Sequence, residues 1–191
     1  MRAVVVLAHP NPASFNHTIA ATVMAALEAG GHSAILHDLY AEGFAAAMST
    51  DEREAYHGDE PAIDPLVQAH IADIASADTL IFVYPTWWST MPAILKGWLE
   101  RVMVPGVGFV FDASGRVRPG LTHIRRLVGI STYGSPHWYV RLINDNGRRT
   151  ISRALRMSTG WRTRTTWLQL YGVDATTIQQ RDAFVAGVAS A

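Results

Sequence analysis

The chain has 191 residues, with 16 basic (Lys and Arg) and 16 acidic side chains, so its formal net charge is zero. This balance argues against a surface for nucleic acid or an anionic membrane, because either partner selects for an excess of basic residues. Cysteine is absent. Disulfides, thiolate nucleophiles and thiolate metal sites are therefore excluded, and any redox chemistry requires a bound cofactor.

The first ten residues, MRAVVVLAHP, contain a short apolar run that ends at His9-Pro10 without a cleavage pattern of small residues. We interpret this run as a first strand and not as a signal peptide. No segment reaches the roughly 18 apolar residues that a bilayer-spanning helix needs. The sequence-based expectation is a cytoplasmic protein.

Apolar, β-branched runs predict five strands, at residues 2–8, 32–40, 78–85, 125–131 and 164–173. The first run does not alternate with polar residues, which is typical of a strand buried on both faces of a parallel sheet.

Between the strands, periodic apolar residues and capping signals predict helices. They lie from Ser14 to Gly30-Gly31, from Asp64 to about residue 76, from Pro92 to Pro105-Gly106, over 138–157 with an interruption at 144–147, and after a cap at Asp174. Residues 41–62 predict a long excursion with one short helix, and residues 107–120 predict a hairpin-like insertion.

Strands that alternate with helices indicate an α/β fold with an open, doubly wound parallel sheet and helices on both faces. No repeat, low-complexity tract or linker divides the chain, so we expect one domain over 1–191. For five strands the favoured order is the flavodoxin-like 2-1-3-4-5. In such sheets ligands bind beyond the carboxyl ends of the strands, at the switch point between strands 1 and 3.

That rule selects three loop segments as the candidate site: HPNPASFN (9–16), PTWWSTM (85–91) and STYGSPHWY (131–139). The first lacks the glycines of a dinucleotide loop or a P-loop. It ends at a helix N-terminus, where free N–H groups favour a phosphate, with Ser14, Asn16 and Thr18 as donors beside His9. Alternatively, Ser14 only caps the helix and His9 is an ordinary surface histidine.

The second segment places Trp87 and Trp88 together after a strand. Two adjacent tryptophans are difficult to bury together, so we favour a wall for a flat ligand over core packing. Trp98 lies on a helix face with Ile94 and is expected to pack in the core. The third segment has Gly134, which allows close approach of the backbone. Read alone, it is an ordinary strand-to-helix turn. Together the three segments indicate a phosphorylated flat heterocycle, a flavin, which carries its own two-electron chemistry.

The stretches VLAHPNPASFNHTIA and YPTWWSTMPAILKGWLERV resemble the flavodoxin-like NAD(P)H:quinone oxidoreductases, the DT-diaphorase group with its short bacterial members. The resemblance covers most of residues 2–172. It implies a flavin-containing homodimer, with FAD and FMN both open, that passes two electrons from NADH or NADPH to a quinone-like acceptor. Alternatives are an azo- or nitroreductase on the same fold and a regulatory subunit that activates a potassium-efflux transporter.

The resemblance also implies roles for single residues. His9, Ser14, Phe15 and Asn16 correspond to residues at the phosphate-bearing side chain of the flavin. The ring would be lined by Pro85, Thr86, Trp87 and Trp88 on one side and by Ser131, Thr132, Tyr133 and Gly134 on the other. Trp88 occupies the motif position, and Trp87 a variable one. Tyr139 corresponds to a tyrosine that hydrogen-bonds near the ring, and it is our candidate for stabilising the reduced ring.

The chain departs from this pattern at two positions. Tyr133 stands where longer members have a glycine, and Asp145 stands where they have the histidine partner of the tyrosine, although His137 is near in sequence. Arg116, Arg118 and Arg141 are all candidates for contacting a 2′-phosphate of NADPH. The eight histidines are scattered along the chain, so we predict no metal site.

Overall fold

The computed structural model describes all 191 residues. Its centre is a parallel sheet of five strands in the order β2-β1-β3-β6-β7. These strands are β1 (Arg2–Leu7), β2 (Ser33–Asp38), β3 (Thr79–Thr86), β6 (Arg126–Tyr133) and β7 (Arg164–Tyr171). The hairpin strands β4 and β5 stand outside this sheet, so the order is the predicted 2-1-3-4-5 and the flavodoxin-like expectation is confirmed.

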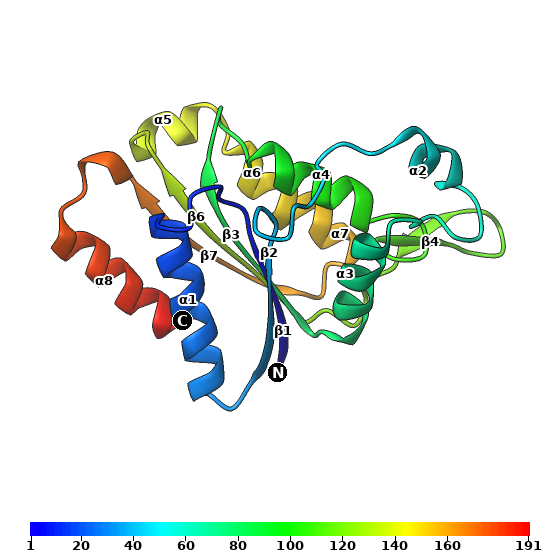
Figure 1. The fold of residues 1–191 in the computed structure, drawn as a ribbon, viewed down its shortest axis with the longest axis horizontal. Helices are drawn as coiled ribbons and strands as arrows, with labels where there is room; N and C mark the ends of the chain where they lie inside the picture. The colour runs from blue at the N-terminus through cyan, green and yellow to red at the C-terminus, as the bar shows by residue number, and fades with distance from the viewer.

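Helices cover both faces of the sheet (Figure 1). One face carries α1 (Phe15–Ala29) and α8 (Ile178–Ala189). The other face carries α3 (Pro65–Ser76), α4 (Ala93–Val102) and a continuous helical segment of α6 (Asn146–Arg149), the π-helix η1 (Thr150–Leu155) and α7 (Arg156–Ser158). The short helix α5 (His137–Leu142) lies beyond the end of β6.

The sheet separates two apolar clusters, to which alternate residues of β1 contribute. Val4 and Val6 belong to the cluster under α3 and α4, whereas Val5 and Leu7 belong to the cluster under α1 and α8. Because both faces of β1 are covered, the strand needs apolar residues at every position, as its unbroken run in the sequence predicts.

Two excursions protrude from this frame at the right of Figure 1. The first contains α2 (Thr50–Ala55), which begins with a capping box between Ser49 and Glu52. The second is the hairpin of β4 (Phe109–Phe111) and β5 (Val117–Pro119). No helix in the structure is long and apolar enough to cross a membrane.

One predicted helix start is wrong. Asp174 lies in a short 3₁₀ turn, η2 (Val173–Ala175), and the N-cap of α8 is Thr177. The Thr177 hydroxyl accepts from the Gln180 N–H while the Gln180 side chain accepts from the Thr177 N–H. This reciprocal capping box satisfies two N–H groups that a lone aspartate four residues before the helix cannot reach.

Candidate functional site

The carboxyl ends of β1, β3 and β6 meet at one edge of the sheet and hold a cavity of about 320 Å³. The sheet register sets these ends side by side, with Leu7 paired to Val83 and Thr86 paired to Tyr133. The cavity is lined by His9, Phe15, Asn16, Pro85, Thr86, Trp87, Thr132, Gly134, Val173, Asp174 and Arg181. All three segments selected from the sequence therefore contribute to one cavity.

The loop after β1 is held in place by its own side chains. The Asn11 N–H donates to His9 Nδ1 (3.1 Å), and the Asn11 side-chain oxygen accepts from the Ala13 N–H (2.9 Å). Ser14 then caps α1, its hydroxyl accepting from the His17 N–H at 3.3 Å. Burial lowers the pKa of His9, and the neighbouring His17 adds to this effect. The loop thus presents the positive end of the α1 dipole with a His9 ring that favours its neutral form.

Asn16 is one of two buried polar residues that line the cavity, the other being Thr132, and 4% of its surface is exposed. Its Nδ2 donates to the Thr132 hydroxyl at 3.2 Å, which connects α1 to the end of β6. Its Oδ1 is also buried and has no hydrogen-bond partner. Because an unsatisfied buried oxygen is costly, it indicates a position where a donor from a ligand is expected.

The two tryptophans after β3 have different environments. Trp87 and Thr90 exchange backbone hydrogen bonds of 2.9 and 3.1 Å, and the residues between them, Trp88 and Ser89, have φ angles of 47° and 64°. Positive φ at both central residues is the signature of a type I′ turn. The Trp87 ring lies against His9, with centroids 5.8 Å apart, and lines the cavity. Trp88 is 98% exposed at the tip of the turn and does not line it.

The end of β6 is built from buried residues. Ser131 and Thr132 are buried, and the Ser131 hydroxyl lies 3.0 Å from that of Thr86, joining β6 to β3. Gly134 lines the cavity, and a Cβ there would come within 3.1 Å of an Asp174 carboxylate oxygen. A side chain at this position would therefore crowd the cavity against the loop after β7.

Tyr133 and Tyr139 both lie outside the cavity lining. The Tyr133 hydroxyl donates to Asp145 Oδ2 at 3.0 Å, and its ring stacks on Tyr171 with centroids 4.8 Å apart. Burial raises the pKa of Tyr133, so this phenol stays protonated. Tyr139 is on α5 and is 39% exposed. Asp145, the position at which the resemblance places a histidine partner for Tyr139, bonds Tyr133 instead.

The cavity also contains residues that our reading of the sequence missed: Val173, Asp174 and Arg181. The Arg181 guanidinium donates to the Val173 carbonyl and the Thr176 hydroxyl, both at 2.9 Å, and lies over the Phe15 ring. These contacts hold a cation beside the start of α1. No local pattern marks it, because it reaches the cavity only through the packing of α8 on α1.

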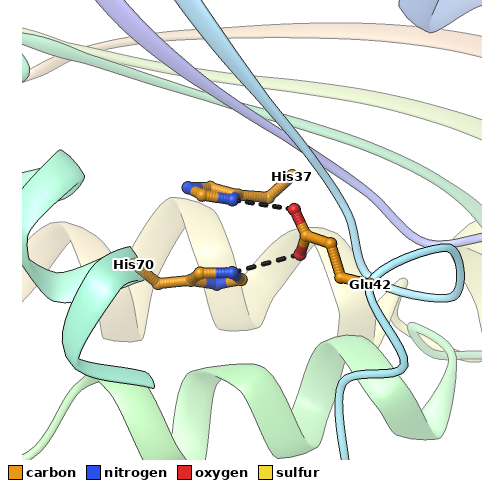
Figure 2. Close-up of side chains that lie close together, drawn as sticks. All are labelled: His37, Glu42 and His70. Carbon is orange, nitrogen blue, oxygen red and sulfur yellow. Dashed lines mark hydrogen bonds and ion pairs between the residues drawn. The ribbon is translucent and has the colours of Figure 1, made fainter. Parts of the chain in front are cut away.

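A second polar cluster lies on the face of the sheet that carries α3 and α4, where His37, Glu42 and His70 come together (Figure 2). The two imidazole rings stack with centroids 3.7 Å apart, and Glu42 contacts both, with N–O distances of 3.1 Å. Trp98, buried as predicted, donates its indole N–H to His70 Nδ1 at 2.8 Å.

The geometry of this cluster does not suit a metal. Since His70 Nδ1 accepts a hydrogen bond from the Trp98 indole N–H, a neutral His70 carries its own proton on Nε2 and has no lone pair there for a cation. The two rings are stacked with 27° between their planes, and His37 Nδ1 and His70 Nε2 each already contact a Glu42 oxygen. We therefore interpret the cluster as a buried hydrogen-bonding and charge network.

Comparison with known proteins agrees with this architecture. Residues 1–185 match a family model described as the flavodoxin-like fold. The chain is 31% identical over 153 residues to NAD(P)H dehydrogenase (quinone) 1 of Rattus norvegicus, which covers 72% of this chain and 56% of that protein. The chain thus spans little more than half the length of this relative.

Two solved structures superpose over the full chain. Smu.1420 from Streptococcus mutans UA159 has a TM-score of 0.84 and 26% identity, with 97% of that chain covered. The NAD(P)H:quinone oxidoreductase from Methanothermobacter marburgensis has a TM-score of 0.82 and 24% identity, with 96% of that chain covered.

Proposed function

The chain belongs to the family with the flavodoxin-like fold, and from this premise we propose that it is a flavin-dependent NAD(P)H:quinone oxidoreductase. Hydride would pass from the dinucleotide to the flavin and two electrons from the flavin to a quinone-like acceptor. The observation that carries the proposal is the cavity at the switch point, which joins a free helix N-terminus, an unsatisfied Asn16 oxygen and the Trp87 ring.

The residues of the cavity fit the two chemical halves of a flavin. Free N–H groups at the start of α1 and the Arg181 guanidinium suit a phosphate. Trp87 and Pro85 offer flat apolar surface for a ring, and the backbone beside Gly134 can approach polar ring edges. FMN and FAD share these halves, so the cavity supports a flavin without distinguishing them.

A bound flavin would supply the two-electron chemistry, and the residues of the chain would orient its ring and limit access of water. We propose a ping-pong order, in which the nicotinamide would leave before the quinone enters the same site. We also propose Tyr139 as the hydroxyl donor that stabilises negative charge on the reduced ring. Its exposed position on α5 leaves the hydroxyl free for this contact.

We further propose that the working unit is a homodimer in the cytoplasm, where it would draw on the cellular pool of NAD(P)H. Three large apolar side chains that follow β3 and β6 in the chain are strongly exposed: Trp88 at 98%, Leu142 at 75% and Trp138 at 67%. The cavity of about 320 Å³ is at the lower end of the size range of ligand sites. A second copy that covers these side chains would enlarge and close the site, and light scattering of the purified protein would measure the dimer mass.

The deciding experiment is to purify the protein, denature it and identify any released yellow chromophore, and to titrate the colourless protein with FMN and FAD. We expect stoichiometric uptake of one flavin and oxidation of NADH or NADPH with quinone. Azo dyes and nitroaromatics run in parallel would rank the acceptor classes. A protein that binds neither flavin contradicts the proposal. Tyr139→Phe should load flavin normally but turn over more slowly at saturating substrates, and full turnover would remove its assigned role.

A further inference from the structure

A cavity of about 750 Å³ lies outside the candidate flavin site and is lined by residues of β7 and of the helical segment α5–α7. Its chemistry is cationic, because five arginines line it: Arg141, Arg148, Arg149, Arg153 and Arg156.

These charges are not compensated by the protein. Residues 141–164 contain seven arginines and a single acidic residue, Asp145. None of the five guanidinium groups has a carboxylate within 4 Å, and Asp145 accepts the Tyr133 hydroxyl. Three of the side chains, Arg141, Arg148 and Arg153, are exposed, and the surplus of like charge makes the cavity attractive to an anion.

The backbone holds part of this cluster in a fixed geometry. The Arg156 guanidinium donates to the carbonyls of Trp161 and Thr163, both at 3.2 Å, and lies 5.4 Å from the centre of the Trp161 ring. Gly160 and Trp161 have φ angles of 71° and 64°. For a tryptophan this left-handed backbone is unfavourable, and such strain is concentrated at functional positions.

The helix that carries the arginines is also irregular. Residues Thr150–Leu155 form a π-helical turn between α6 and α7, flanked by Arg149 and Arg156 and containing Arg153. Turns of this kind are rare and are frequent at functional sites. The local geometry is therefore unusual where the cationic side chains project.

The composition of the walls indicates the class of ligand. Planar guanidinium groups match the oxygen geometry of phosphates, and each can donate two parallel hydrogen bonds. Trp161 and Tyr171 add aromatic surface on which a heterocycle can stack. A volume of about 750 Å³ is sufficient for a nucleotide.

The position of the cavity relative to the flavin site further limits which ligands are candidates. Tyr171 of this cavity stacks on Tyr133, whose chain neighbours Thr132 and Gly134 line the flavin cavity. The stack of Tyr171 on Tyr133 thus links the linings of the two cavities. Among the arginines left open by the sequence, Arg141 lines this cavity, whereas Arg118 is ion-paired to Asp112 at 2.8 Å.

We propose that this arginine-lined cavity binds the phosphate-bearing half of the hydride donor and selects NADPH over NADH through its 2′-phosphate. The inference rests on the proposed oxidoreductase function for the identity of the ligand. The cavity itself is independent of whether a flavin binds.

The test is calorimetric titration of the full chain with adenosine 2′,5′-bisphosphate and with adenosine 5′-monophosphate. We expect the bisphosphate to bind at least about tenfold more tightly, and the affinity to fall as salt is raised, because the contacts are partly exposed ion pairs. Arg149→Gln/Arg153→Gln should lower bisphosphate affinity by about tenfold or more. The same double variant should also lower the ratio of kcat/KM with NADPH to kcat/KM with NADH.

Arg2→Gln/Arg126→Gln is the matched control, since it also removes two exposed charges, at the opposite end of the sheet, where β1 and β6 begin. Equal affinity for the two nucleotides, or a double variant that behaves like this control, overturns the inference. A change in oligomeric mass on light scattering with unchanged nucleotide affinity also overturns it and assigns the arginines to a protein contact.

The outcomes separate this inference from the proposed function. Arginine-dependent bisphosphate binding by a protein that takes up no flavin removes the oxidoreductase proposal and leaves a phosphate site. If the double variant loads flavin and turns over normally, and its ratio of kcat/KM for NADPH to NADH is unchanged, only this inference fails and the oxidoreductase proposal stands.

Discussion

Asn16 has one hydrogen bond within the protein, from Nδ2 to the Thr132 hydroxyl, and one unsatisfied atom, Oδ1. A single substitution tests whether a phosphate lies beside this side chain. Asn16→Asp keeps the size of the side chain, and the bond that Asn16 Nδ2 donates to the Thr132 hydroxyl at 3.2 Å can be replaced by one that the hydroxyl donates to the carboxylate. It places a carboxylate at the start of α1, where we expect a phosphate. The affinity for FMN or FAD should fall by about tenfold or more from like-charge repulsion.

Quenching of flavin fluorescence on titration measures this affinity, and circular dichroism checks that the fold is retained. Asn146→Asp, which adds the same charge at an exposed position on α6, should leave the affinity unchanged. Wild-type affinity in Asn16→Asp would show that the phosphate does not lie at the start of α1.

Single residues of the site were partly predictable from the sequence. The strand-end rule located His9, Asn16, Thr86 and Gly134 in one cavity, because parallel strands end at one edge. Motif position favoured Trp88 over Trp87, whereas the structure puts Trp87 in the cavity lining and leaves Trp88 at the tip of a turn. The hand of that turn depends on backbone angles that two adjacent tryptophans do not predict.

At the scale of elements, one close contact explains the glycine in the stretch PAILKGW (92–98). Gly97 of α4 packs against the backbone of the excursion after β2, and a Cβ there would come within 1.9 Å of the Ala46 carbonyl oxygen. The helix and the loop therefore touch without an intervening side chain. Gly97→Ala should lower the free energy of unfolding by about 1–3 kcal/mol, the usual cost of overpacking, measured by urea denaturation.

Gly187→Ala is the control for this prediction. Gly187 lies inside α8, and nothing is within 4 Å of the position a Cβ would take. Alanine in an open helical position should stabilise the protein by about 0.5–1 kcal/mol. Destabilisation of both variants by the same amount would mean that the Ala46 contact is not the cause.

The elements themselves were largely predictable, because each depends on local signals. All five strands and the hairpin insertion lie where the apolar runs and turn residues place them. The π-helical turn could not be predicted, since the apolar spacing of Ile151 and Leu155 is also that of an ordinary helix. Arg181 was missed for a different reason, because its place beside α1 follows from the packing of α8 on α1 on the same face of the sheet.

At the scale of the whole molecule, two charge networks on the face of α3 and α4 control the response to acid. Arg101 is 4% exposed and ion-pairs with Glu52 and Asp64, at 2.6 and 2.7 Å, which attaches the excursion to α4. Burial raises the pKa of each carboxyl, but hydrogen bonds from Arg101 and from backbone N–H groups outweigh burial, so both pKa values are lowered. Their stabilisation is therefore present above the unfolded pKa and lost as pH falls through the folded one.

The His37–Glu42–His70 cluster adds a second dependence at higher pH. Burial lowers the pKa of His70 from 6.5 to about 4, with the neighbouring His37 contributing. Below about pH 6.5 His70 is therefore protonated in the unfolded chain but not in the folded chain. The free energy of unfolding falls as pH drops from about 6.5 to about 4. Burial raises the pKa of Glu42, which acts in the opposite direction and offsets part of this loss.

The predicted result is a free energy of unfolding that is nearly constant between pH 7 and about 9, below the range in which tyrosines ionise, and decreases by up to about 3 kcal/mol between pH 6.5 and 4. Urea denaturation at a series of pH values measures it. His70→Gln keeps an acceptor for the Trp98 indole and removes the titrating group, so its curve should be flatter in this interval. At still lower pH both proteins should lose stability alike, because Glu52 and Asp64 are unchanged. Parallel curves for wild type and His70→Gln from pH 7 to pH 4 would rule out His70 as the group responsible.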